Sequence, residues 1–205
     1  MSRRLAIHPV SPQARLVDQA VSALRAGQLL AYPTDSGYAF GFALDARTAL
    51  DRVARLRQLD TRHNFTLACR DLKQIGQYAR VDDAAFRLMR AHLPGAYTFI
   101  LPASALVPKR IATEKRRSIG VRVPDHRVAQ SLIAALGEPI LSSSLLLPGQ
   151  DLHGMEVDEL AELLESQVDV FVDGGACGVH PTTVVSLLDQ PWKVLRVGSG
   201  VVDWE

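Results

Sequence analysis

Residues 28–44 read QLLAYPTDSGYAFGFAL, and the first five of them predict a buried strand that leaves a sheet. Pro33 to Gly37 then place hydroxyls, a carboxylate and a glycine where that strand surfaces, before apolar residues resume. In open α/β proteins, polar residues at the carboxyl end of a strand lie in the crevice where ligands bind. The same residue types also form turns for local reasons. Both interpretations, a binding site and a turn, stay open from these residues alone.

The segment before this strand has the pattern of a helix. In residues 11–27, apolar residues recur at helical spacing between Leu16 and Leu24. Ser11 is the expected N-cap, and Gly27 stands where the helix should end. The order strand, helix, strand therefore opens the chain.

The rest of the chain continues this alternation. We expect helices that begin after the N-caps Asp45, Asp71 and Asp82, and two more helices at 127–136 and 156–165. We expect strands at 5–7, 65–69, 94–103, 119–123, 138–144, 168–175, 182–187 and 193–197. Strands interleaved with helices predict an α/β fold in which helices flank a sheet. Consecutive strands late in the chain imply that the sheet is mixed. We expect one domain over residues 1–205, with its core at about 8–200.

Composition narrows the class of protein. The 205 residues are 47% hydrophobic with a net charge of +1, so the chain can bury a core and is not strongly basic overall. Cys69 and Cys177 are too few for a disulfide framework, which favours a reducing cytosol. No stretch approaches the roughly 20 apolar residues of a membrane helix, and the first residues make a poor signal peptide. We expect a cytoplasmic protein without a membrane partner.

Two groups of hydroxyls are candidate binding residues. Thr34 and Ser36 follow the opening strand, with the phenol of Tyr38 close behind for substrate contact. Ser142, Ser143 and Ser144 end a second apolar run, where they could bind phosphate or carboxylate oxygens. The alternative for the serines is that small residues only allow tight packing.

Basic residues supply the complementary charge. Arg122 stands in the alternating segment IGVRV, so its guanidinium needs a buried or bound anion. The basic run at 109–117 is expected to be a solvated face. Arg57, His63 and Arg196 add further positive groups.

Several common sites are absent from the sequence. There is no GxxxxGK[ST] phosphate loop, no GxSxG motif of serine hydrolases and no HExxH or other paired-ligand spacing. A dedicated metal site is therefore not expected. What remains is a pocket of hydroxyls and arginines, which suits a phosphorylated and carboxylated substrate.

Seven segments together resemble a known family. YPTDSGYAFG, RQLDTRHNFTL, PGAYTFIL, SIGVRVPDH, ILSSSLLLPG, PTTVVSL and LRVGSG occur in the order expected of the YrdC-like superfamily, and most closely resemble its YciO branch. The match runs from about Val21 to Gly200. The resemblance implies a single-domain YrdC-like fold, a twisted sheet with a concave, positively charged cavity. Relatives make L-threonylcarbamoyladenylate from threonine, bicarbonate and ATP, as a first step of tRNA modification.

The resemblance also implies roles for residues. Thr34 and Tyr38 would face the threonine and nucleotide pocket, and Ser118 and Arg122 would line it. Ser142 would contact threonine and Ser144 would contact ATP. Thr183 and Arg196 would close the nucleotide side, and Arg57 and His63 stand at phosphate-facing positions. Arg122 would hold a carboxylate with its planar fork. ATP would enter with Mg²⁺ as a substrate complex, and no permanent cofactor or catalytic residue is assigned.

Two positions depart from the synthase pattern. Where synthases have a Lys-x-Arg pair, the chain reads Arg57-Gln58-Leu59, and where they have Ser-x-Asn it reads Ser144-Leu145-Leu146. The leading hypothesis is therefore a nucleotide-binding protein of the YciO type, with weak or altered nucleotidyltransferase activity toward ATP or AMP and threonine or a related carboxylate. The alternative is a non-catalytic protein that binds double-stranded RNA or tRNA through the same basic cavity.

Overall fold

The opening stretch forms an antiparallel hairpin. In this computed structural model, which describes residues 2–59, 65–112, 117–152, 155–178 and 180–204, strand β2 (Leu30–Thr34) pairs with β3 (Gly37–Phe42). Asp35 and Ser36 are the two residues of the turn between them. The hairpin lies inside the sheet, since β8 pairs with β2 on one side and β7 with β3 on the other.

The hairpin belongs to one ten-stranded sheet in the order β1-β8-β2-β3-β7-β4-β6-β5-β9-β10. The other strands are β1 (Arg3–Ala6), β4 (Thr66–Ala68), β5 (Tyr97–Pro102), β6 (Ser118–Arg122), β7 (Ile140–Ser144), β8 (Val170–Asp173), β9 (Thr183–Ser186) and β10 (Lys193–Arg196). Pairs such as β4 with β6 are parallel, and pairs such as β5 with β6 are antiparallel. The predicted α/β fold with a mixed sheet is confirmed.

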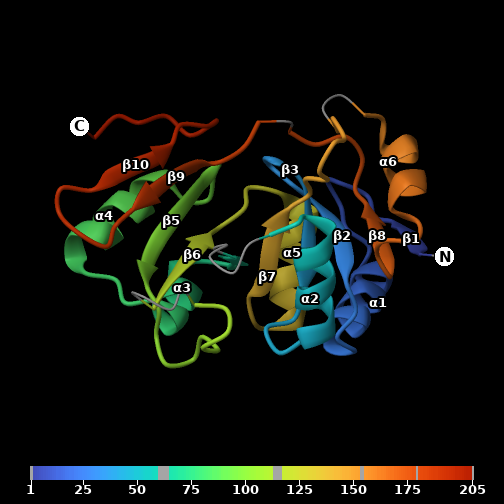
Figure 1. Cartoon of the computed structure of the whole chain (residues 1–205), viewed down its shortest axis with the longest axis horizontal. Coiled ribbons are helices and arrows are strands. Elements are labelled where there is room, and N and C mark those ends of the chain that lie inside the picture. Colours follow the sequence, from blue (N-terminus) through green and yellow to red (C-terminus); the bar gives the residue numbers. More distant parts are fainter. Residues whose placement is uncertain (1, 60–64, 113–116, 153–154, 179, 205) are drawn as a thin grey trace.

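Helices flank the sheet on both sides. They are α1 (Ala14–Arg25), α2 (Arg47–Leu56), α3 (Leu72–Tyr78), α4 (Asp83–His92), α5 (Arg127–Leu136) and α6 (Val157–Leu164). Helices α1 and α5 pack with Leu30 and Ile140 on one side of the strands, while α2 packs with Phe40 and Leu141 on the other. Figure 1 shows α3 and α4 beside β5 at one end of the molecule and α6 beside β8 at the other.

The N-caps expected for α3 and α4 are confirmed, because an aspartate side chain makes each cap. Asp71 and Asp82 accept hydrogen bonds from the backbone N–H groups of Gln74 and Ala85, and so cap α3 and α4. Ser11 is not the cap of α1, which starts after Gln13. The backbone N–H of Ser11 instead donates to Nδ1 of His8, so this residue belongs to the preceding bend.

The cap expected for α2 was also misplaced. Asp45 precedes the N-cap position, which Ala46 holds without a side-chain hydrogen bond. Among the described residues, no helix is both long enough and apolar enough to cross a membrane.

Candidate functional site

A cavity of about 260 Å³ opens on the sheet. Strands β2 to β7, β9 and β10 all contribute to it, so that the hollow extends across most of the sheet. Its lining is Thr34, Ser36, Tyr38, Ala39, Arg57, Thr66, Thr98, Ile100, Gly120, Arg122, Ser142, Ser143, Ser144, Leu146, Thr182, Val184, Leu195 and Arg196. Most of these side chains are short, and short side chains across a twisted sheet leave a hollow.

The turn of the hairpin holds one wall of the cavity. Oγ1 of Thr34 donates to the carbonyl of Gly37 at 2.6 Å and accepts from the backbone N–H of Ser36 at 3.2 Å. These bonds fix the turn so that Thr34 and Ser36 both line the cavity. The turn and the candidate site, which the sequence offered as alternatives, are therefore the same segment.

Arg122 crosses beneath this turn. Its Nη2 donates to Oδ1 of Asp35 at 2.5 Å and its Nη1 to Oγ of Ser36 at 2.9 Å. The side chains of Arg122 and Asp35 are only 9% and 13% exposed. The prediction that Arg122 needs an anion is confirmed, and the chain itself supplies that anion from the turn.

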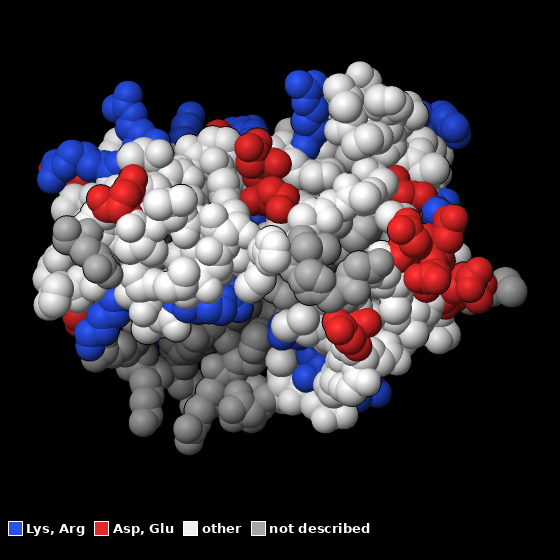
Figure 2. Space-filling view, turned by 90° about the horizontal axis from the view of Figure 1, so that it is seen from above, with Lys and Arg blue, Asp and Glu red and all other residues white. Residues whose placement is uncertain are grey.

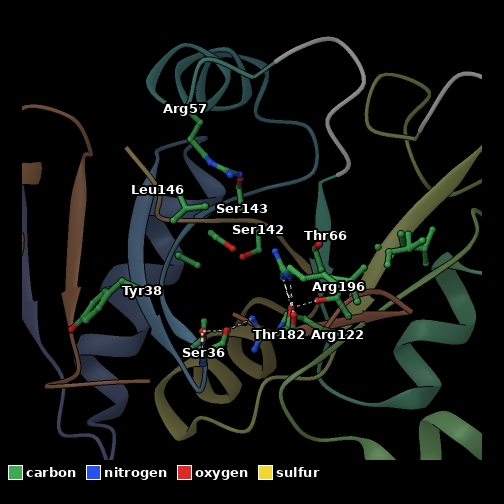
Figure 3. Close-up of a pocket in the computed structure, with 18 residues that line it drawn as sticks. Ser36, Tyr38, Arg57, Thr66, Arg122, Ser142, Ser143, Leu146, Thr182 and Arg196 are labelled. Atoms are coloured by element: carbon green, nitrogen blue, oxygen red, sulfur yellow. Dashed lines mark hydrogen bonds between the residues drawn. The ribbon is translucent and has the colours of Figure 1, made fainter. Parts of the chain in front are cut away.

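Two further arginines approach the cavity from other elements. Nη1 of Arg57, the C-cap residue of α2, donates to Oγ of Ser143. Arg196 on β10 donates through Nε and Nη2 to the carbonyl of Thr182, at 3.0 and 2.9 Å. Figure 3 shows Arg57 and Ser143 on one side of the cavity and Arg122, Arg196 and Thr182 on another.

The charged forms of Arg57 and Arg196 are both disfavoured in the cavity. Burial lowers the pKa of Arg57, and the charge of Arg196 lowers it further. Burial likewise lowers the pKa of Arg196, with a contribution from Arg122. Among the described residues that line the cavity, none is Asp, Glu, His, Lys or Cys. An anion bound between these arginines would relieve their repulsion.

Apolar side chains stand at the mouth of the cavity. Leu146 and Leu195 line it although they are 55% and 57% exposed. Leu195 and Arg196 are adjacent in sequence, yet both face the cavity. The pairing of β10 with β9 shifts between Val194 and Arg196, and such a bulge turns two successive side chains to one side. The cavity thus combines cationic, hydroxyl and apolar surfaces.

Most of the predicted site residues meet at this cavity. Thr34, Tyr38, Arg57, Arg122, Ser142, Ser144 and Arg196 all line it. His63 lies outside the described residues. The binding roles of these residues stay predictions.

Three predicted residues are placed differently from the expectation. The hydroxyl of Tyr38 donates to the carbonyl of Gly175 at 3.1 Å and its ring stacks on Phe171, and Figure 3 shows this hydroxyl directed away from the other labelled side chains of the cavity. Ser118 is buried on β6 and does not line the cavity. Thr183 is also buried, and its hydroxyl donates to the carbonyl of Gly200 at 2.6 Å.

Several lining residues were not expected from the sequence. Thr182 lines the cavity in place of Thr183, because successive residues near a strand point to opposite sides. Thr66 and Thr98 also line it. Thr66 is the one hydroxyl residue of β4, and Thr98 is the one aliphatic hydroxyl of β5, so each is a small polar residue within an otherwise mostly apolar strand. That signal could have found both threonines.

The chain is similar to several known proteins over most of its length. The family model Sua5_yciO_yrdC, described as telomere recombination, matches residues 22–198. The chain is 49% identical to YciO of Escherichia coli K12 over 202 residues, which is 98% of each chain. The crystal structure of E. coli YciO matches with a TM-score of 0.93 over 98% of both chains.

Two more distant relatives carry names that specify a reaction or a ligand. The chain is 33% identical to the threonylcarbamoyl-AMP synthase of Vibrio vulnificus YJ016 over 161 residues, covering 77% of this chain and 86% of the synthase. The crystal structure of P. abyssi Sua5 complexed with L-threonine matches with a TM-score of 0.86 and 25% identity, over 96% of this chain and 58% of Sua5.

Proposed function

The chain belongs to the Sua5, YciO and YrdC family, and from this premise we propose that its cavity binds an adenine nucleotide together with L-threonine or a related carboxylate. The activity that best suits this pair is a weak or altered form of threonylcarbamoyl-AMP synthesis. The relationship to a threonylcarbamoyl-AMP synthase and to a Sua5 protein that binds L-threonine supports the proposal.

The convergence of Arg57, Arg122 and Arg196 on one hydroxyl-rich cavity is the observation that carries the proposal. A nucleotide phosphate and an amino-acid carboxylate are both oxyanions, and arginine binds such groups through its planar fork. The exposed Leu146 and Leu195 add apolar surface at the mouth, which suits the flat face of a base.

The chemistry requires positioning more than covalent catalysis. The amine of threonine adds to bicarbonate with loss of water, which gives a carbamate. A carbamate oxygen then attacks the α-phosphorus of ATP, and the bond to diphosphate breaks as diphosphate leaves. Negative charge grows on the phosphate oxygens and the leaving group, so guanidinium groups near them lower the barrier. Mg²⁺ would enter on the phosphates of ATP as part of the substrate.

Two leucines account for the expected weakness of the reaction. Leu146 lines the cavity at the position where synthases have an amide, and it cannot donate a hydrogen bond to a phosphate. Leu59 stands where synthases have the arginine of the Lys-x-Arg pair, but it packs against the hydrophobic core and does not line the cavity. The nucleotide therefore meets fewer donors than in a synthase, which is the reason to expect slow turnover with binding retained.

Incubation of the purified protein with ATP, L-threonine and bicarbonate tests the proposal. We expect slow release of diphosphate that depends on threonine, and threonylcarbamoyl-AMP detected by chromatography and mass spectrometry. Isothermal titration calorimetry with AMP tests binding separately from turnover. Absence of both nucleotide binding and diphosphate release would refute the proposal, whereas binding without release would remove only the catalytic part.

A further inference from the structure

A buried tyrosine is hydrogen-bonded to one of the serines of the cavity. Tyr32 on β2 is 1% exposed, and its hydroxyl donates to Oγ of Ser142 on β7 at 2.9 Å. Strand β3 lies between these two strands, and the residue opposite Ser142 on it is Gly41. A Cβ at Gly41 would come within 2.7 Å of the Tyr32 ring. The glycine thus opens the path by which Tyr32 reaches Ser142.

Burial fixes the direction of this hydrogen bond. A phenol O–H removed from water must donate to an acceptor, because leaving it unpaired costs free energy. Since Ser142 is its acceptor, the Ser142 hydroxyl cannot also donate to Tyr32. A serine hydroxyl has one proton of its own, which stays available to a further acceptor. Ser142 lines the cavity, so a ligand can be that acceptor.

Arginines impose the same direction on other hydroxyls of the lining. A guanidinium can only donate hydrogen bonds. Arg57 donates to Oγ of Ser143, Arg122 donates to Oγ of Ser36 at 2.9 Å, and Arg196 donates to Oγ1 of Thr182 at 3.1 Å. In each pair the hydroxyl is the acceptor. Ser36 and Thr182 each have a second hydroxyl close by that can take their proton, Oγ1 of Thr34 at 3.3 Å and Oγ1 of Thr98 at 2.9 Å. Ser143 is therefore the second hydroxyl, after Ser142, whose proton can be donated into the cavity.

We propose that Tyr32 is a positioning residue, which holds Ser142 as a hydrogen-bond donor toward an oxyanion in the cavity. Tyr32 and Arg57 together leave the hydroxyls of Ser142 and Ser143 as donors into the cavity, so the cavity favours ligand groups that are rich in acceptor oxygens, such as a phosphate. The inference rests on the proposed role of the cavity as an oxyanion site, but it does not depend on which nucleotide or carboxylate binds there.

The test is a double-mutant cycle on oxyanion affinity. Inorganic phosphate and AMP are titrated separately by isothermal titration calorimetry into the unmodified protein, Tyr32→Phe, Ser142→Ala and the double variant. We expect Ser142→Ala to weaken phosphate binding about tenfold or more, as for a lost hydrogen bond to a charged group. Tyr32→Phe should weaken it about threefold to tenfold. In the Ser142→Ala background, Tyr32→Phe should have no further effect, because its action passes through that serine.

A control separates positioning from folding. Tyr78→Phe removes a phenol hydroxyl from α3, which does not line the cavity, and should leave phosphate affinity unchanged. Thermal unfolding of each ligand-free variant shows whether the fold is kept. If Tyr32→Phe melts earlier but binds phosphate as the unmodified protein does, its role is structural and the inference is wrong.

The remaining outcomes distinguish this inference from the proposed function. Binding of phosphate without AMP, together with the expected non-additivity, would support the positioning role of Tyr32 and contradict the nucleotide proposal. Equal, additive losses from Tyr32→Phe and Ser142→Ala would contradict the positioning role while leaving the nucleotide proposal intact. Failure of the unmodified protein to bind either probe would overturn both.

Discussion

At the scale of single residues, the pair formed by Arg122 and Asp35 fixes one of the three positive charges of the cavity. Both side chains are nearly buried, and each would be costly to bury alone. The carboxylate neutralises part of the charge of Arg122, and it also holds the guanidinium at the edge of the cavity. Arg122 is therefore already oriented before any ligand arrives.

Removal of Arg122 should damage stability as well as binding. Arg122→Ala leaves the carboxylate of Asp35 buried without its partner, so the free energy of unfolding should fall by about 3 kcal/mol. Urea denaturation followed by circular dichroism measures this change. The affinity for AMP should also fall by about tenfold or more, because a cation is lost from the site.

Two variants control for this result. The double variant Arg122→Ala with Asp35→Ala removes the orphaned charge and should be more stable than Arg122→Ala alone. Arg90→Ala removes an exposed arginine from α4 and should change the free energy of unfolding by less than about 0.5 kcal/mol. Equal losses in Arg90→Ala and Arg122→Ala would contradict the placement of Arg122 in a buried ion pair.

Leu146 is the residue whose replacement should strengthen nucleotide binding. Leu146→Asn adds an amide donor to the lining at an exposed position, so it should cost little stability while raising the affinity for ATP about threefold to tenfold. Calorimetric titration with ATP measures the gain. Leu106→Asn, at a position that is 62% exposed and away from the lining, is the matched control. An unchanged affinity in Leu146→Asn would show that this side chain does not face the phosphates.

At the scale of elements, the residues of the β2–β3 hairpin both form part of the sheet and line the cavity. Its turn is packed from outside by the segment after β8, because a Cβ at Gly178 would lie 2.2 Å from the carbonyl oxygen of Asp35. The hydroxyl of Tyr38 binds Gly175 in that segment. These contacts hold the turn, and with it Thr34 and Ser36, against the rest of the sheet.

The cap of α3 gives a prediction about pH. The hydrogen bond from the backbone N–H of Gln74 holds the pKa of Asp71 below its ordinary value of 3.8. A carboxyl whose pKa is lowered on folding stabilises the protein above its unfolded pKa, and this contribution is lost as the pH falls through the folded pKa. Asp71→Ala should therefore cost about 1 kcal/mol at neutral pH. This loss of unfolding free energy should become smaller as the pH falls below the ordinary pKa of aspartate.

Urea denaturation at a series of pH values measures this effect. Asp71→Asn is the matched control, because an asparagine caps the helix without titrating. It should keep most of the stability and remove the pH dependence at this position. A cost of Asp71→Ala that stays constant from neutral to acid pH would contradict a role for the ionised carboxylate.

At the scale of the whole molecule, the distribution of charge bears on the RNA-binding alternative. The net charge is +1. Figure 2 shows acidic side chains gathered over α6 and cationic side chains scattered elsewhere on that face, without one continuous basic surface. Tight binding of duplex RNA draws on many phosphate contacts and weakens steeply with salt. This face offers no such surface.

Because the net charge is only +1, we expect weak binding of duplex RNA or tRNA at physiological ionic strength. Electrophoretic mobility shifts at low and physiological salt measure it, and competition with AMP shows whether the cavity is involved. Tight binding that falls steeply with salt and is lost in Arg122→Ala would favour the RNA-binding alternative over nucleotide chemistry.

The sequence alone predicted most of the elements and many of the residues that line the cavity, but it did not identify β3 as a strand. Hydrophobic periodicity is local, so it predicted the alternation of strands and helices and the exact bounds of α5. An arginine in a buried strand needs an anionic partner whatever the fold, so the sequence alone identified Arg122 as a residue with such a partner. Hydroxyls that follow apolar strands likewise pointed to Thr34 and Ser142.

Only the tertiary structure decided which partners these residues have. Strand order brought Asp35 to Arg122, a bulge turned both Leu195 and Arg196 toward the cavity, and Gly41 let Tyr32 reach Ser142 across a strand. Period-two alternation could not tell Thr182 from Thr183, because it fixes only that neighbours face opposite sides. Which side meets the cavity depends on contacts between segments far apart in the chain, and local sequence carries no record of those contacts.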